Sequence, residues 1–267
     1  MTTVFDGKAY AQNITARLKQ TISEAGLAPH LAIVMIGEDQ ASRIYVDKKV
    51  EAAREIGAEA EVLDFPEDVP EGEIIRHLRN LNDDKSVTGI IVQLPLPKGL
   101  KKERVLSQIE RTKDVDGLTK GSQFVGATPR AVMEILTSSN QTLVGKYAVV
   151  VGSSDLVGKP VANLLLDENA TVTVTNDKTK DLASFTRAAD ILVSCAGVGH
   201  LITAEMVKDG VVVIDVGITR QRDGKIVGDV EFEGVCSKSS FITPVPGGVG
   251  PMTVAMLLSN LVLASQK

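Results

Sequence analysis

The sequence has no tryptophan, only three tyrosines and only two cysteines, Cys195 and Cys236. So few aromatic side chains, together with a formal net charge of -5, provide neither the stacking surfaces nor the basic face that nucleic-acid binding uses. The two cysteines are too few and too far apart in sequence for a disulfide framework. The composition therefore argues against a nucleic-acid partner and favours a reducing compartment.

Long apolar runs are also missing. No window approaches the roughly 20 apolar residues that span a bilayer, and the first residues, MTTVFDGKAYAQ, lack the basic and then apolar order of a secretory signal. We expect a cytoplasmic protein that does not enter a membrane. Metal ligands are equally sparse, because the three histidines are scattered and the cysteines do not form a zinc-binding pair. No metal site is expected.

Apolar segments alternate with helical patterns along both halves of the chain. Continuous apolar strands separated by helices predict parallel sheets covered on both faces. We therefore predict an α/β fold with two domains, each with a mostly parallel sheet covered by helices, the second being Rossmann-like. The predicted strands cover residues 31–36, 60–63, 89–92, 147–152, 171–174, 191–194 and 211–216, and the predicted helices residues 10–24, 41–56, 71–81, 129–137, 156–166 and 252–264.

A glycine-containing turn, Gly152-Ser153-Ser154-Asp155-Leu156-Val157-Gly158, joins a predicted strand to a predicted helix. Glycines let a ligand approach the main chain, and the amides at a helix N-terminus suit a phosphate. A simple strand-to-helix turn explains the pattern equally well, because the spacing differs from the usual dinucleotide fingerprint. The candidate cofactor-binding residues are Gly152, Ser153, Ser154, Val157 and Gly158.

Asp177 stands at the end of the next predicted strand, 19 residues after Gly158. A carboxylate there can accept hydrogen bonds from a ribose 2′-hydroxyl and would repel a 2′-phosphate. Asp177 therefore favours NAD over NADP. Lys178 and Lys180 argue weakly in the opposite direction, although lysines at a helix start are more typical of a solvated surface.

Three further patterns carry candidate catalytic groups. Tyr45 and Lys49 are four residues apart in a helical pattern and so share one face. Gln93 follows a predicted strand, at the edge of the sheet where ligands bind in open α/β folds. The sequence Lys113-Asp114-Val115-Asp116-Gly117 adds two carboxylates that could cap a helix or hydrogen-bond the N–H groups of a heterocycle. Each pattern alone also fits a solvated helix face or a satisfied loop.

The segment 244–253 contains three prolines and three glycines in ten residues. Prolines fix φ, whereas glycines permit positive φ and close approach of a ligand to the main chain. We predict a shaped, ligand-facing loop ahead of the last helix. A tight structural turn is the alternative.

Together these motifs resemble the bifunctional methylenetetrahydrofolate dehydrogenase/cyclohydrolase family, and the resemblance runs nearly end to end. Asp6-Gly7-Lys8, Val216-Gly217-Ile218 and Val227-Gly228-Asp229-Val230 also match that family. The resemblance implies two domains flanking a cleft, a homodimer formed through the nucleotide-binding domains, and a last helix that returns to the first domain. We therefore expect a folate-binding catalytic domain at 1–140 with 251–267, and a dinucleotide-binding domain at 141–250.

The resemblance also implies roles for the catalytic candidates. Lys49 would be the acid/base group at the one-carbon bridge of a tetrahydrofolate substrate, because a partly desolvated ammonium can exchange protons near pH 7. Gln93 would tune Lys49, Tyr45 would stack on or hydrogen-bond the folate, and Asp116 would grip the pterin.

The remaining candidates would bind ligands. Pro246, Gly247 and Gly250 would line the cleft, and Ile218 would join the glycine turn in binding NAD or NADP. The implied reaction oxidises 5,10-methylenetetrahydrofolate to 5,10-methenyltetrahydrofolate and then hydrolyses this product to 10-formyltetrahydrofolate.

Two departures from the family leave alternatives open. Residues 118–127 replace a longer family segment, so the cyclohydrolase step could be lost, leaving a dehydrogenase alone or a non-catalytic protein that binds folate or nucleotide. Ser153 and Thr175-Asn176-Asp177 stand where many NADP-using members have Arg and a Cys-His-Ser run, which favours NAD. A dehydrogenase of small hydroxy acids would leave the segment 244–253 and the Tyr-Lys pair unexplained.

Overall fold

A computed structural model describes residues 1–266, apart from the Ala41 side chain. The chain forms two compact units, and neither is continuous in sequence. One unit combines Met1–Ala11 with Thr128–Thr253, and the other combines Gln12–Ala127 with the chain from Val254 onward. The division falls within the two longest helices, α1 (Gly7–Ala25) and α9 (Val249–Ser265).

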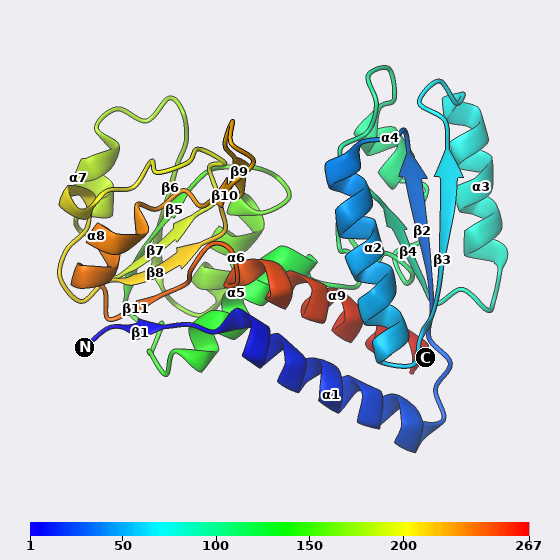
Figure 1. The fold of residues 1–267 in the computed structure, drawn as a ribbon, viewed down its shortest axis with the longest axis horizontal. Helices are drawn as coiled ribbons and strands as arrows, with labels where there is room; N and C mark the ends of the chain where they lie inside the picture. The colour runs from blue at the N-terminus through cyan, green and yellow to red at the C-terminus, as the bar shows by residue number, and fades with distance from the viewer. Residues whose placement is uncertain (267) are drawn as a thin grey trace. The chain divides into compact units, whose positions relative to one another are not determined.

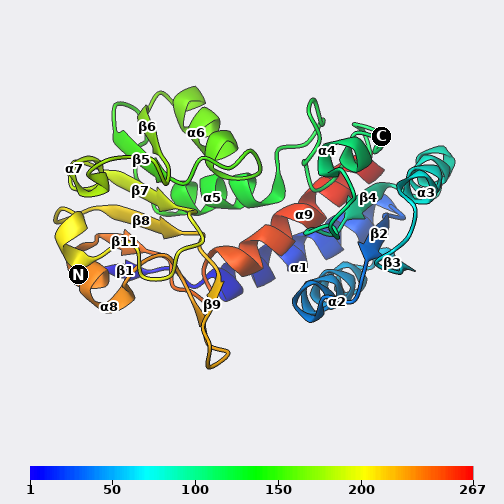
Figure 2. The same ribbon diagram turned by 90° about the horizontal axis from the view of Figure 1, so that it is seen from above.

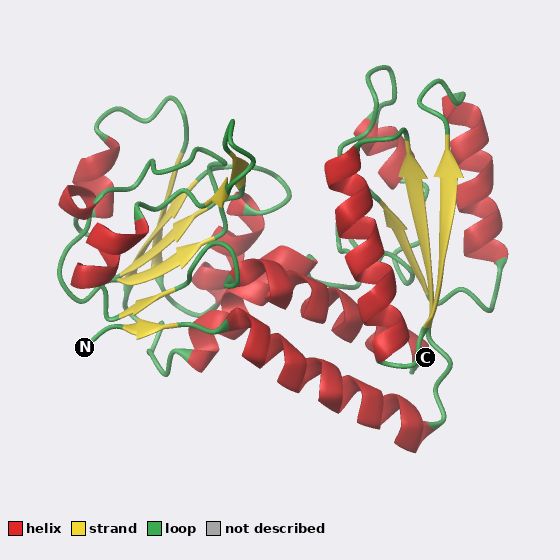
Figure 3. Cartoon of the chain, in the orientation of Figure 1, coloured by secondary structure: helices red, strands yellow, loops and turns green. Residues whose placement is uncertain are grey.

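The unit built on Gln12–Ala127 contains a three-stranded parallel sheet. Its strands are β2 (His30–Ile36), β3 (Glu59–Phe65) and β4 (Gly89–Val92), in the order β3-β2-β4. Along β2, alternate side chains enter two separate cores, because successive side chains of a strand point to opposite faces. The helices α2 (Gln40–Glu55) and α3 (Glu71–Asp83) cover opposite faces of this sheet (Figure 3).

The second unit contains a six-stranded, wholly parallel sheet in the order β1-β11-β8-β7-β5-β6, which Figure 2 shows edge to edge. The strands are β5 (Tyr147–Val151), β6 (Thr171–Thr175), β7 (Ile191–Ser194), β8 (Val212–Asp215), β11 (Phe241–Ile242) and β1 (Thr3–Val4). The chain runs from β5 to β6 on one side and then crosses to β7 on the other. This reversal is the topological switch point of a Rossmann-like sheet, where ligands bind beyond the carboxyl ends of the strands.

Helices and a small hairpin complete this second unit (Figure 1). The predicted fold class is confirmed, since both sheets are parallel and packed with helices. The remaining elements of this unit are α5 (Ala127–Ser138), α6 (Gly158–Asp167), α7 (Leu182–Thr186), α8 (Phe232–Lys238), the 3₁₀ helix Ala204–Met206, and the antiparallel pair β9 (Thr219–Arg220) and β10 (Ile226–Val227). The short helix α4 (Lys102–Leu106) belongs to the unit built on Gln12–Ala127.

The chain's first residues form a short strand that the sequence analysis does not predict. Thr3 and Val4 pair with Phe241 and Ile242, so the N-terminus forms the edge of the six-stranded sheet. A two-residue strand has no periodicity to read, and only its distant partner defines it. Within residues 1–266, no helix combines the length and apolar character that crossing a bilayer requires.

Candidate functional site

Lys49, Gln93 and Asp116 come together in the unit built on Gln12–Ala127. Lys49 Nζ donates a hydrogen bond to Gln93 Oε1 at 3.2 Å and lies 3.6 Å from Asp116 Oδ2. The Lys49 and Asp116 side chains are 13% and 18% exposed. The ammonium is therefore partly withdrawn from water, with one carboxylate and one amide oxygen beside it, while a ligand can still reach it.

The sheet places these groups. Lys49 lies on α2, and Gln93 follows β4 directly, where its main-chain N–H extends the ladder by donating to Val34 O at 2.9 Å. The Lys113–Asp116 segment runs beside β4, because Ile90 N donates to Lys113 O at 2.8 Å. Gln93 Nε2 donates to Leu94 O at 2.7 Å, which fixes the amide with its oxygen toward Lys49.

Tyr45 is an exposed neighbour of this cluster. It precedes Lys49 by one helical turn on α2, and its side chain is 38% exposed. The ammonium of Lys48 lies 5.9 Å from the centre of its ring, within the range of a cation–π contact. The tyrosine thus presents an aromatic face beside the cluster without being fixed by it.

The two carboxylates of the Lys113–Gly117 motif have different surroundings. Asp114 is buried and accepts hydrogen bonds from Leu118 N at 3.2 Å, Thr119 N at 2.8 Å and Thr119 Oγ1 at 2.7 Å. It shapes the turn that follows, whereas Asp116 faces Lys49. The sequence pattern alone did not separate these two roles.

Asn260 is a residue that sequence reasoning missed. It is buried on α9, and its Nδ2 donates to Val115 O at 2.9 Å and to Val125 O at 3.0 Å. Ala127 N donates to Asp116 O at 3.2 Å, so the short segment 118–127 closes directly over the Asp116 main chain. The available signal was a polar amide inside a mostly apolar helical run, which a buried helix tolerates only with partners.

The glycine turn after β5 lies at the switch point of the six-stranded sheet. Gly152 has φ +114°, and a Cβ there would lie 2.6 Å from Cys195 O, so only glycine fits. Gly158 begins α6 against the carbonyl of Gly152. Ser154 Oγ accepts hydrogen bonds from Val157 N at 3.2 Å and Gly158 N at 3.3 Å, which closes the turn ahead of α6.

The other cofactor candidates lie at the same edge of this sheet. Asp177 follows β6 and is exposed, with its Oδ2 2.7 Å from Lys178 Nζ. Ile218 follows β8 and is also exposed. Each of these candidates follows a strand: Ser153 follows β5, Asp177 follows β6 and Ile218 follows β8. The three strands end at the same edge of the sheet.

The segment 244–253 is only partly a loop. The helix α9 begins at Val249, so Gly250 and Pro251 lie in its first turn and not in an extended loop. Proline is tolerated there because the first-turn amides have no partner within the helix. Pro246 is exposed, Gly247 has φ +107°, and Gly248 N donates to Pro244 O at 2.9 Å, which closes a turn ahead of the helix.

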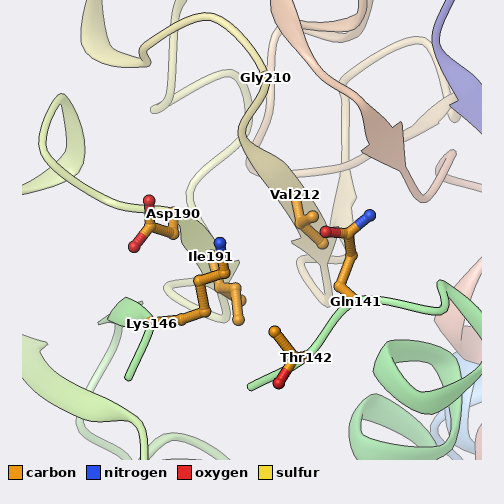
Figure 4. A pocket seen from close by; sticks show the side chains of 7 residues that line it. All are labelled: Gln141, Thr142, Lys146, Asp190, Ile191, Gly210 and Val212. Carbon is orange, nitrogen blue, oxygen red and sulfur yellow. The ribbon is translucent and has the colours of Figure 1, made fainter. Parts of the chain in front are cut away.

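A cavity of about 50 Å³ lies at the opposite, amino edge of the six-stranded sheet (Figure 4). It is too small for a dinucleotide, so it does not compete with the switch point as the cofactor site. Its lining is formed by Gln141, Thr142, Lys146, Asp190, Ile191, Gly210 and Val212.

Comparison with known proteins identifies the family. Residues 5–116 match the catalytic domain of tetrahydrofolate dehydrogenase/cyclohydrolase, and residues 126–267 match the NAD(P)-binding domain of the same enzymes. The chain belongs to the tetrahydrofolate dehydrogenase/cyclohydrolase family. The resemblance seen in the motifs is thereby confirmed, and Lys49, Gln93 and Asp116 lie within the matched catalytic domain or at its last residue.

Individual relatives agree over the full chain. The bifunctional protein FolD of Exiguobacterium sibiricum is 46% identical, with 100% of each chain covered. The crystal structure of the FolD methylenetetrahydrofolate dehydrogenase/cyclohydrolase of Campylobacter jejuni has a TM-score of 0.97 and 44% identity, covering 100% of this chain and 99% of that one. The Trypanosoma brucei enzyme, solved with NADP and an inhibitor, has a TM-score of 0.94 and 37% identity, with 99% and 97% covered.

Proposed function

We propose that the protein oxidises 5,10-methylenetetrahydrofolate with a nicotinamide cofactor and then hydrolyses the product to 10-formyltetrahydrofolate. The observation that carries this proposal is the Lys49–Gln93–Asp116 cluster inside a chain of this family. Hydride leaves the one-carbon bridge for the nicotinamide, which leaves a methenyl cation. Water then adds to that carbon and loses a proton, and the ring opens to the formyl product.

Lys49 is the proposed acid/base group at the one-carbon bridge, where it would accept the proton that water loses in the hydrolytic step. Its Nζ has hydrogen-bond contact with Gln93 and an ionic partner in Asp116, so the two neighbours hold the amine in one orientation. A positioned group of this kind contributes about 10²–10⁴-fold to rate. In this proposal Asp116 accepts hydrogen bonds from the pterin and the exposed ring of Tyr45 stacks on the folate.

The segment 118–127 supports the retention of the cyclohydrolase step. Although short, it is closed onto Asp116 O by Ala127 N, and Asn260 holds Val125 O beside Val115 O. Asp116 therefore lies in an ordered loop. Neither a dehydrogenase that lacks the cyclohydrolase step nor a non-catalytic binding protein requires such a loop.

We further propose that the cofactor is NAD in preference to NADP. The exposed Asp177 carboxylate at the end of β6 suits a ribose 2′-hydroxyl and repels a 2′-phosphate. Its ion-pair partner, Lys178, opposes this preference by neutralising part of the charge. Ser153 supplies no cation in the glycine turn. An Asp177→Ala protein should therefore lose its preference, with the ratio of kcat/KM for NAD to that for NADP falling about tenfold or more.

The test is a spectrophotometric assay of purified protein with 5,10-methylenetetrahydrofolate and either NAD or NADP, following both reduced nucleotide and the methenyl product. We expect turnover that is faster with NAD and little accumulation of the methenyl form. Lys49→Met should reduce kcat for hydrolysis of the methenyl form at least about 100-fold, whereas Lys48→Met, a matched change one residue away on α2, should leave this kcat within a few-fold. Full turnover by Lys49→Met would refute the acid/base role.

The family resemblance also leads us to propose a homodimer, and the sparse cysteines a cytoplasmic location. Light scattering on purified protein should give twice the mass of one 28.4 kDa chain. A monomer mass would refute the dimer.

A further inference from the structure

Two buried aspartates lie at the carboxyl edge of the six-stranded sheet, and no role described above includes them. Asp215 is the last residue of β8 and is 3% exposed, while Asp229 follows β10 and is 0% exposed. Among residues 1–266, no ion pair within 4.0 Å involves either carboxylate. Their hydrogen-bond partners are main-chain amides and one hydroxyl of the same unit.

Asp215 binds two loops at once. Its Oδ1 accepts hydrogen bonds from Gly217 N at 2.9 Å and Asp229 N at 3.0 Å, and its Oδ2 accepts one from Val230 N at 3.0 Å. Gly217 directly precedes Ile218, the exposed side chain proposed to contact the cofactor. Asp215 thereby fixes the start of the loop after β8 against the segment after β10.

Asp229 in turn binds the loop after β7. Its Oδ2 accepts hydrogen bonds from Ser194 Oγ at 2.9 Å, Ala196 N at 2.7 Å and Gly197 N at 3.3 Å, and its Oδ1 accepts one from Val198 N at 2.9 Å. One carboxylate thus holds three consecutive main-chain amides and fixes the backbone between them.

This loop also contacts the glycine turn. Cys195 O lies 2.6 Å from the position of a Cβ on Gly152, so the residue next to the held amides packs against the first residue of the proposed phosphate turn. Two glycines make the arrangement possible. A Cβ on Gly217 would overlap the Asp229 carboxylate, and a Cβ on Gly228 would overlap the Asp215 carboxylate.

We propose that Asp215 and Asp229, with the amides they bind, form a carboxylate clasp that positions the loops after β7 and β8 to bind the nicotinamide cofactor. Both are positioning residues, because they act through the main chain of these loops. Stability alone does not account for them, since two buried carboxylates without a cation cost free energy that an apolar pair would not. The inference rests on nucleotide binding by this unit, but not on the identity of the second substrate.

The test is a fluorescence titration of NADH and NADPH into the wild-type protein and into Asp229→Asn, Asp215→Asn and Ser194→Ala. An asparagine would turn N–H donors toward main-chain N–H groups, so the first two variants should raise the Kd for the preferred nucleotide at least about tenfold. Ser194→Ala removes one donor and leaves the amides, so it should raise the Kd a few-fold.

Asp190→Asn is the matched control. Asp190 precedes β7 at the amino edge of the same sheet and lines the cavity of Figure 4, where it accepts from Tyr147 N at 2.8 Å and from Lys208 Nζ at 2.6 Å. The Asp190→Asn variant therefore loses a carboxylate hydrogen bond, as Asp229→Asn does, but at the sheet edge opposite the switch point. Its nucleotide Kd should stay within about twofold of the wild-type value, and tetrahydrofolate binding measured by calorimetry without nucleotide should stay unchanged in every variant.

Unchanged nucleotide affinity in folded Asp229→Asn and Asp215→Asn would overturn the clasp, as would an equal loss in Asp190→Asn. If Asp229→Asn and Asp215→Asn do not fold, the nucleotide Kd of Ser194→Ala is compared with that of Asp190→Asn, and this comparison decides the test. A wild-type protein that binds NADH but does not oxidise 5,10-methylenetetrahydrofolate would refute the proposed function and leave the clasp test valid. A wild-type protein that binds neither nucleotide would refute the clasp.

Discussion

At the residue scale, Asp215 shows how burial changes acidity. Burial raises the pKa of Asp215 from 3.8 to about 6, and the charge of Asp229 adds to this rise, while the amides of Val230, Asp229 and Gly217 oppose it. Because the native pKa is the higher one, the native state holds a proton between about pH 4 and pH 6 that the unfolded chain has released. The contribution of Asp215 to stability is therefore most favourable near pH 4 and is lost as the pH rises through 6.

Substituting Asp215 should make this dependence visible. We expect the free energy of unfolding of the wild type, minus that of Asp215→Asn, to fall by up to roughly 3 kcal/mol between pH 4 and pH 7.5, since one pKa unit is worth about 1.4 kcal/mol. Urea unfolding followed by circular dichroism measures it. Asp190→Asn is the control, because Lys208 lowers the pKa of Asp190 and its effect should be flat over this range. A flat difference for Asp215→Asn would contradict the raised pKa.

Individual residues also show which parts of the site the sequence could reveal and which it could not. Lys49, Gln93 and Asp116 stand in recognisable motifs and were predicted, and the structure places all three together. Their functional roles stay predictions. Asn260 was missed because its partner Val115 is 145 residues away in sequence. Asp229 was noted only as part of a motif, since its contacts are with main-chain atoms of other loops.

At the element scale, the two helix starts of α6 and α3 predict opposite effects of the same substitution. Gly158 begins α6, and a Cβ there would overlap the main-chain carbonyl of Gly152 and lie 3.2 Å from Ser153 Cα. Gly72 is the second residue of α3, and a Cβ there would meet nothing within 4 Å. Gly158→Ala should lower the free energy of unfolding by about 1–3 kcal/mol, because the backbone must shift.

Gly72→Ala should instead raise the free energy of unfolding by about 0.5 kcal/mol, since alanine loses less backbone entropy in a helix. Thermal unfolding of the two variants beside the wild type tests the pair. Equal melting temperatures would show that α6 can move away from Gly152, and that close packing does not require glycine at this position.

Strands that are buried on both faces were predictable from the sequence, whereas short helices such as α7 and α8 were not predicted. The strands β2, β5 and β7 lie where continuous apolar runs predicted them, because each is long enough to show a pattern and is buried on both faces. The strands β1 and β11 contain two residues each, and β1 is defined only by its pairing with β11, across more than 200 residues of chain. The start of α9 was predicted three residues late, because its glycine and proline resemble a loop.

At the scale of the whole molecule, the last helix supplies part of a core that otherwise comes from the first half of the chain. Leu257, Leu258, Leu261 and Val262 are buried in one cluster with Leu31 and other residues of the three-stranded sheet and its helices. Burying one such side chain contributes about 1.5–3 kcal/mol. Four of them contribute roughly 6–12 kcal/mol, comparable to the entire stability of a domain, about 5–15 kcal/mol.

Removing residues 254–267 should therefore unfold this unit, although Lys49, Gln93 and Asp116 all remain in the chain. Circular dichroism of the truncated protein should show no cooperative melting transition for the unit, and tetrahydrofolate binding should be lost. A chain ending after Ser265 retains all four apolar side chains and Asn260, so it should melt within a few degrees of the full chain. Cooperative melting of the shorter protein near the wild-type temperature would mean that residues 12–127 form a sufficient core alone, and that the helix serves only to hold the Asp116 loop through Asn260.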